Sequence, residues 1–217
     1  RFSVLTAVGL FPAIFAGVNI DELFEGANSI KKLLLNADLS ENYFIQTASH
    51  ILSLYLESKP RCDETVLMPY SSKLKEFSFW FVQLWAESLG KIKSTAEGSR
   101  SVGLTPIPAY GATDQHSQVQ LFMEGPNTKC LFLININHHN TDYKLDSELE
   151  LESAQKLAPY TMNQLMEAEF NGTLKALQEN DRNFIQLELD KITPHAMGNL
   201  IVFFESLTAI VGHYLEI

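Results

Sequence analysis

Lys129-Cys130-Leu131-Phe132-Leu133-Ile134-Asn135-Ile136 is the stretch that decides the fold of this chain. Its apolar residues form a continuous run instead of alternating with polar ones, which is typical of a parallel strand covered on both faces. Thr65-Val66-Leu67-Met68 has the same character and ends at Pro69. Two such segments predict a parallel sheet in the interior of the protein.

Helical patterns alternate with these strands along the chain. We expect helices over Val4–Phe15, Ile20–Leu35, Glu41–Glu57, Lys73–Leu89, Ala154–Gln178 and His195–Leu207. Thr105–Ala109 reads as an extended stretch pinned by two prolines, and Phe184–Leu189 alternates as an edge strand does. Strands that alternate with helices predict an α/β layer fold with a mainly parallel sheet. The chain shows no internal repeat, low-complexity tract or obvious interdomain linker, and its 217 residues are enough for one large domain or two small ones.

Three helices carry more specific expectations. Val4–Phe15 is apolar on nearly every side and should be an interior helix. A secretory signal is the alternative for this run, but no initiator Met precedes it. Lys73–Leu89 should be almost wholly buried, because large apolar residues cover most of its circumference. Pro159 and Gly172 are weak points of Ala154–Gln178.

Composition excludes several classes of protein. The chain has 217 residues, 46% of them hydrophobic and 19% charged, as in ordinary soluble globular proteins. A net charge of −10 argues against nucleic-acid binding. The apolar run near the N-terminus is too short for a membrane span and is interrupted by Pro12. Cys62 and Cys130 indicate two free thiols in a reducing, cytoplasmic setting, although spacing alone leaves one disulfide open.

Glu87 is the first candidate for chemistry. Gln83 and Glu87 lie four residues apart and share one face of the helix that Gly90 ends, together with Trp80. The dipole at a helix C-terminus disfavours a negative charge, and burial beside aromatic rings would disfavour it further. Both effects suit a general base. The plainer interpretation is a surface glutamate at a frayed helix end.

His116 is the second candidate. Thr113 is a good N-cap, so His116 would lie in the first turn of a helix, where the dipole favours a neutral imidazole. The plainer interpretation is a histidine satisfied by local hydrogen bonds. His138 and His139 do not make a metal site, because neighbouring residues of a strand point to opposite sides and no zinc-like spacing accompanies them. We expect no metal and no cofactor.

Several motifs together resemble one enzyme family. Trp80 to Lys91, which includes Ala86-Glu87-Ser88-Leu89-Gly90-Lys91, and Ala112 to Phe122, which includes Asp114-Gln115-His116, resemble active-site segments of glucose-6-phosphate isomerases. Arg1-Phe2-Ser3-Val4 resembles the end of a glycine-glycine-arginine-aromatic-serine signature, and Gly198 to Glu205 matches the family's late helix. The resemblance covers essentially the whole chain.

This resemblance implies a reaction and a role for each residue. The fold would be the three-layer sandwich of a sugar-isomerase (SIS) domain, and the reaction would interconvert glucose 6-phosphate and fructose 6-phosphate through an enediol. Glu87 would move the proton, Arg1 would stabilise the developing oxyanion, and Gln83 would line the sugar site. His116 would assist ring opening in the site of the neighbouring subunit, so a homodimer is implied.

Two departures from the family matter. Its Ser/Thr-rich phosphate cradle lies in a preceding domain, and its late lysine lies beyond the position of Ile217. The chain therefore looks like the C-terminal SIS domain of a longer isomerase, and we expect it to be inactive alone. The alternatives are a sugar-phosphate-binding module without catalysis and a folded segment that only dimerises.

Overall fold

The core of the molecule is a four-stranded parallel sheet with the strand order β4-β1-β5-β6. The computed structural model describes residues 2–36, 38–95, 98–144 and 152–217. The strands are β1 (Glu64–Pro69), β4 (Thr105–Pro108), β5 (Lys129–Ile136) and β6 (Asn183–Leu189). β1 and β5 occupy the centre, as their continuous apolar runs predict, and β6 is the edge strand that its alternation indicates.

Alternate residues of the central strands face two separate apolar layers. Leu67 and Phe132 belong to one cluster of buried residues, and Val66 and Leu131 belong to the other. Val66 pairs with Leu131 in the β1–β5 register, and Leu67 pairs with Phe132, so both faces of the sheet are apolar at the same level. A sheet of this kind is stable only when helices cover it on both sides.

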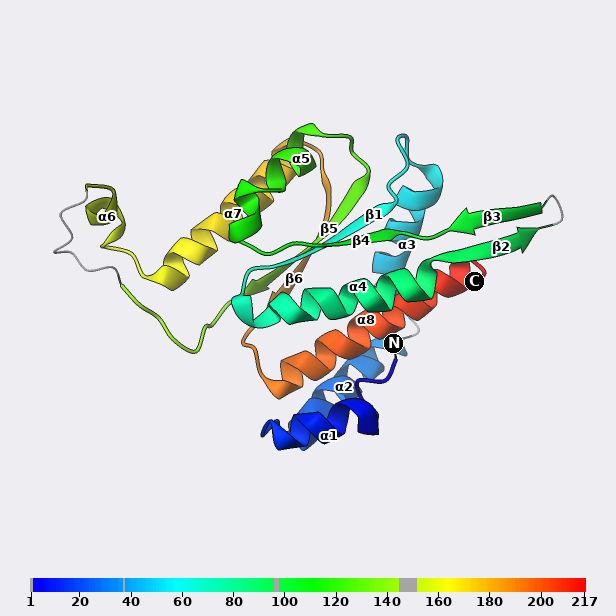
Figure 1. Ribbon diagram of the computed structural model, residues 1–217, viewed down its shortest axis with the longest axis horizontal. Helices are drawn as coiled ribbons and strands as arrows, with labels where there is room; N and C mark the ends of the chain where they lie inside the picture. Colours follow the sequence, from blue (N-terminus) through cyan, green and yellow to red (C-terminus); the bar gives the residue numbers. More distant parts are fainter. Residues whose placement is uncertain (1, 37, 96–97, 145–151) are drawn as a thin grey trace.

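Helices supply both covers, and the result is the expected three-layer sandwich (Figure 1). One layer contains α3 (Tyr43–Glu57), α4 (Lys75–Leu89) and α8 (Pro194–Tyr214). The opposite layer contains α5 (Val119–Glu124) and α7 (Met162–Glu179). Phe204 of α8 lies at the centre of the first layer, with its ring 5.3 Å from that of Phe132 and 5.2 Å from that of Phe81.

The expectation of an interior helix at Val4–Phe15 is wrong. The helix there, α1 (Ala7–Phe15), has no buried residue, and Phe15 is 78% exposed. α1 lies outside α2 (Ile20–Leu34), which itself packs on α8 (Figure 1). An apolar circumference indicates burial only when neighbours surround the helix, and α1 has a neighbour on one side.

Two other helix expectations need correction. α4 follows a short 3-10 helix (Ser72–Leu74) and is not wholly buried, since Phe79 is 50% exposed. The helix expected over Ala154–Gln178 is divided into α6 (Glu152–Leu157) and α7, and Pro159 lies in the break. Thr161 then starts α7 with a capping box. The polar composition of Thr141–Leu151 predicts a surface excursion, and residues 145–151 of it lie outside the described part.

The antiparallel hairpin of β2 (Lys91–Thr95) and β3 (Gly98–Val102) was not expected from sequence. It extends past the end of α4 (Figure 1). Among the described residues, α8 is the one helix with the length and apolarity of a membrane span. Its side chains at Phe204, Leu207 and Val211 are fully buried against the other helices and the sheet, as in the core helix of a globular protein.

Candidate active site

Gln83 and Glu87 share an exposed face of α4, as their spacing predicts. The opposite face of the helix is buried through Phe81, Leu84 and Trp85. The side chain of Glu87 is exposed, as in the plainer interpretation of a surface glutamate, and is not buried beside aromatic rings. Trp80 packs on Phe77 instead, with ring centroids 4.9 Å apart. A carboxylate and an amide are thus presented together at the end of a rigid helix.

The C-terminal end of α4 is held in place by a close backbone contact. Gly103 has a φ of +149°, and a Cβ atom there would lie 3.1 Å from the Cα of Gly90, the residue that ends the helix. The ammonium group of Lys91 donates to the carbonyl oxygen of Glu87, which satisfies one of the last carbonyls of the helix. These contacts fix where the backbone of Glu87 lies relative to the start of β4.

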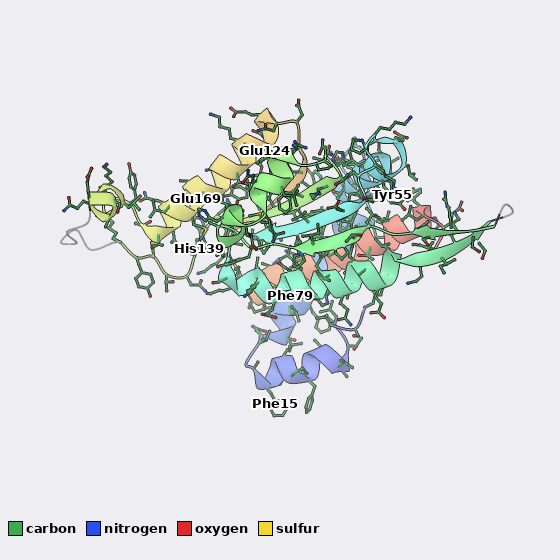
Figure 2. All side chains as sticks on the ribbon, turned by 45° about the horizontal axis from the view of Figure 1, so that its top comes forward. Phe15, Tyr55, Phe79, Glu124, His139 and Glu169 are labelled. Carbon is green, nitrogen blue, oxygen red and sulfur yellow. The ribbon has the colours of Figure 1, made fainter. Side chains whose placement is uncertain are left out.

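A cleft of about 430 Å³ lies beside this helix end, between Ala86, Gly90, Tyr55 and the segment before β4. Figure 2 labels Tyr55 near this end of the molecule. Arg61 lies 5.1 Å from the centroid of the Tyr55 ring and forms an ion pair of 3.3 Å with Asp63. Tyr55 and Arg61 were not predicted from sequence, because neither stands in a motif.

His116 ends a single 3-10 turn, Thr113–His116, and its side chain is exposed. The expected N-cap is wrong: Ala112 occupies the cap position and no side chain caps the turn. Instead, the Asp114 carboxylate accepts hydrogen bonds from the Tyr110 backbone N–H (2.7 Å) and from the Ser117 hydroxyl (2.8 Å). The helix-dipole argument for His116 therefore does not apply, since one such turn is not a helix with an aligned dipole.

The segment around His116 is anchored through its neighbours. The side-chain amide of Gln115 donates to the Tyr70 hydroxyl (2.9 Å) and to the Thr173 hydroxyl (2.7 Å). A Cβ atom on Gly111 would lie 2.6 Å from the Tyr70 ring, so only glycine allows this approach. Tyr70 directly follows β1, which places His116 at the carboxyl edge of the sheet.

Glu87 and His116 lie at opposite edges of the sheet. α4 starts near the carboxyl end of β1 and runs back to the segment that enters β4, as Figure 1 shows. Fifteen helical residues and six strand residues each span roughly 20 Å. One small substrate cannot contact both side chains of the same copy.

The remaining residues considered in the sequence analysis are Arg1, His138 and His139. Arg1 lies outside the described residues. His138 pairs with Asp190 at 3.4 Å, and both His138 and His139 line a different cleft at the end of β5. No group of three or more His, Cys, Asp or Glu side chains within the described ranges could hold a metal ion. Asn163 and Glu167 also line that cleft, and neither was predicted from sequence.

The sequence of this chain is similar to a protein-family model and to proteins of known name along nearly its whole length. The family model described as phosphoglucose isomerase matches residues 1–217. A glucose-6-phosphate isomerase of Thermus thermophilus is 39% identical over 217 residues, which are 100% of this chain and 50% of the relative. A probable glucose-6-phosphate isomerase of Methanococcus maripaludis is 35% identical over 212 residues, which are 98% of this chain and 45% of the relative.

Solved structures agree with these sequence matches. The crystal structure of a hypothetical protein from Thermus thermophilus has a TM-score of 0.90 at 37% identity and covers 100% of this chain and 50% of its own. A Chlamydia trachomatis glucose-6-phosphate isomerase has a TM-score of 0.69 at 22% identity, covering 88% of this chain and 37% of its own, and shows the same fold. The chain spans about half the length of the curated relatives it matches.

Proposed function

The chain belongs to the phosphoglucose isomerase family, and on that premise we propose that it supplies the proton-transfer part of an aldose–ketose isomerase. The substrates are glucose 6-phosphate and fructose 6-phosphate, which places the enzyme in glycolysis and gluconeogenesis in the cytoplasm. The observation that carries the proposal is the exposed Gln83–Glu87 pair at the end of α4, within a chain that the family model matches throughout.

Glu87 is the general base of this reaction. Its carboxylate removes the proton from C2 of the open-chain aldose and returns it to C1, while O1 gains a proton and O2 loses one. The intermediate is a cis-enediol. An exposed carboxylate at a fixed helix end can reach a bound substrate, and positioning of this kind contributes about 10²- to 10⁴-fold to the rate. Gln83, one turn earlier, binds the sugar hydroxyls.

Arg1 stabilises the negative oxygen of the enediol, a role that suits a guanidinium because it keeps its charge. His116 assists ring opening in the active site of a second copy. The separation of Glu87 and His116 within one copy supports this arrangement, because a homodimer can bring the two residues together from different subunits. No metal or organic cofactor takes part.

The chain is one SIS-type domain, the C-terminal part of a longer isomerase, and has little activity by itself. Its span of about half the relatives' length supports this. A sugar-phosphate-binding module without catalysis is the second candidate, favoured by the exposure of Glu87 in the isolated chain. If the chain bound fructose 6-phosphate but did not convert it, both alone and within a complete enzyme, the second candidate would be the correct one.

A hybrid enzyme tests the proposal. The 217 residues replace the matched half of the Thermus thermophilus relative, and the conversion of fructose 6-phosphate to glucose 6-phosphate is followed with a coupled dehydrogenase. We expect turnover by the hybrid, little by the chain alone, and a loss of at least about 100-fold in the Glu87→Gln hybrid.

Glu76→Gln is the matched control, because Glu76 is exposed in the first turn of the same helix. It should leave kcat unchanged. A folded Glu87→Gln hybrid with ordinary kcat would refute the assignment of Glu87. A folded hybrid without turnover, combined with binding of fructose 6-phosphate, would favour the binding module.

A further inference from the structure

A second, larger cleft lies at the carboxyl end of β5. It has a volume of about 680 Å³ and is bounded by the loop after β5 and by the first turns of α7. Figure 2 labels His139, which stands on that loop. In open α/β sheets, ligands bind in the crevice outside the carboxyl ends of the strands. The volume falls within the range of small-molecule sites.

The lining of this cleft is rich in hydrogen-bonding groups. Asp142 accepts from the backbone N–H of Asn163 through Oδ1 (3.1 Å), and the Asn163 amide donates to the Thr141 carbonyl (3.2 Å). Asp142 Oδ2, the Asn163 side-chain oxygen, the Glu167 carboxylate and both ring nitrogens of His139 have no hydrogen-bond partner among the described residues. These groups are available to a ligand.

The floor of the cleft is partly apolar. Ile136, which is buried at the end of β5, and Met166, which is partly buried on α7, are the apolar lining residues. Asn135, one residue earlier, adds an amide whose nitrogen lies 3.3 Å from Asn137 Oδ1. An apolar floor edged by amides, carboxylates and an imidazole matches the faces of a sugar, whose C–H groups are apolar and whose hydroxyls both donate and accept.

An anion fits this cleft poorly. The carboxylates of Asp142 and Glu167 both line it, and Asp142 already accepts from the Asn163 N–H at the start of α7, which an anion would otherwise use. A metal ion fits poorly as well, since the described residues offer no cluster of three ligands. A neutral ligand with several hydroxyls needs neither a net positive charge nor a ligand cluster.

We propose that the cleft between the carboxyl end of β5 and the start of α7 binds a neutral carbohydrate. Glu167, Asp142 and Asn163 accept hydrogen bonds from its hydroxyls, His139 completes the polar wall, and Met166 contacts the apolar face of the ring. The site uses none of the residues assigned to isomerisation. The test of this site is therefore independent of the test of the isomerase function.

The test is a titration of the 217-residue chain labelled with ¹³C at its methionine methyl groups and histidine rings. The chain has five methionines, of which Met166 lines the cleft and Met68 is fully buried in β1. D-glucose is added up to about 100 mM, because a site with few contacts binds in the millimolar range. Inorganic phosphate and sodium chloride are titrated in parallel.

We expect the Met166 and His139 signals to shift saturably with D-glucose while Met68 does not move. Glu167→Ala should weaken the binding about three- to tenfold, as the loss of one typical hydrogen bond at an exposed side chain predicts. Glu179→Ala is the control, because it makes the same change on an exposed residue near the other end of α7. Three results would overturn the proposal: no saturable shift with D-glucose, saturation with phosphate instead, or equal weakening by the two substitutions.

Discussion

Gly26 of α2 lies against the backbone carbonyl of His195 in α8, and a Cβ atom at position 26 would lie 1.9 Å from that oxygen. The contact is between two backbones, so neither side can give way by rotating a side chain. Gly198 of α8 lies equally close to the backbone of α2. A Cβ atom at position 198 would lie 2.0 Å from the Leu23 carbonyl oxygen. Two glycines thus set the distance between α2 and α8.

We expect Gly26→Ala to lower the free energy of unfolding by about 1–3 kcal/mol or more, because the two helices must separate to admit the methyl group. Gly172→Ala is the control. Gly172 lies within α7, and a Cβ there would meet nothing within 4 Å. The Gly172→Ala substitution should raise the free energy of unfolding by up to about 1 kcal/mol, because alanine favours a helix more than glycine does. Urea unfolding measures both, and a neutral Gly26→Ala would contradict the packing argument.

The buried thiols should make stability fall at alkaline pH. Burial raises the pKa of the Cys62 thiol from 9.0 to about 11, helped by the charges of Asp63 and Glu64, and burial also raises the pKa of the Cys130 thiol. The folded chain therefore holds the thiol proton more tightly than the unfolded chain. The resulting stabilisation is complete below pH 9 and is lost as the pH rises from about 9 to about 11.

The measurement compares the original chain with Cys62→Ala in urea unfolding at several pH values. The free energy of unfolding should fall more steeply between pH 9 and 11 in the original chain, by up to about 2 kcal/mol. Identical slopes would contradict the assigned pKa. In the native state at pH 8, both free thiols should also react slowly with a thiol reagent and rapidly after unfolding.

A buried ion pair joins the amino ends of β1 and β5. Lys129 Nζ lies 3.1 Å from Glu64 Oε2, and the Thr128 hydroxyl donates to Glu64 Oε1 at 2.8 Å. The Lys129 side chain is only 8% exposed. Lys129→Met would leave the Glu64 carboxylate with one partner in a poorly solvated place, so we expect a loss of about 1–3 kcal/mol in urea unfolding.

The exposed pair of Lys156 and Glu152, four residues apart on α6, provides the control at a similar distance of 2.8 Å. Both side chains are more than 70% exposed, and Lys156→Met should change stability by less than about 0.5 kcal/mol. Adding Glu64→Gln to Lys129→Met should recover part of the loss, because the unpaired charge is removed. Equal losses at Lys129 and Lys156 would mean that burial does not decide the strength of these pairs.

The strands of this fold could be predicted because the pattern of apolar residues in each strand indicates which of its faces other elements cover. β1 and β5 are apolar on both faces and lie at the centre, whereas β6 alternates and lies at the edge. The hairpin of β2 and β3 carries mostly Lys, Ser, Thr, Arg and Gly, so its backbone pairing leaves no hydrophobic pattern. The exposure of α1 could not be predicted, because the apolar residues of a helix do not indicate whether other elements pack around it.

The candidate site was predictable to a similar extent. Helical spacing alone puts Gln83 and Glu87 on one face. The distance between Glu87 and His116 depends on the strand order and on the direction of α4, which no local pattern encodes. The turn before His116 was misjudged because the Asp114 side chain bonds to the Tyr110 N–H, a local contact that competes with helix capping.

The opposite placement of Glu87 and His116 gives a test of the proposed shared active site. In the hybrid enzyme, Glu87→Gln and His116→Ala should each reduce turnover by at least about 100-fold when present in every subunit. A mixed dimer of the two variants contains one site in which the original Glu87 meets the original His116 of the other subunit. Random exchange of subunits makes half of the dimers mixed, so about a quarter of the original activity should return.

Exchange is verified by a mass difference between the two variants, and activity is followed as exchange proceeds. Activity should return only when subunits exchange between the two variants. It should not return when the dimers are cross-linked before mixing, because cross-linking prevents the exchange. Mixing Glu87→Gln with Glu87→Gln/His116→Ala gives no intact site and is the matched control. If verified mixed dimers showed no more activity than the separate variants, the proposal that His116 of one subunit completes the active site of the other would be wrong.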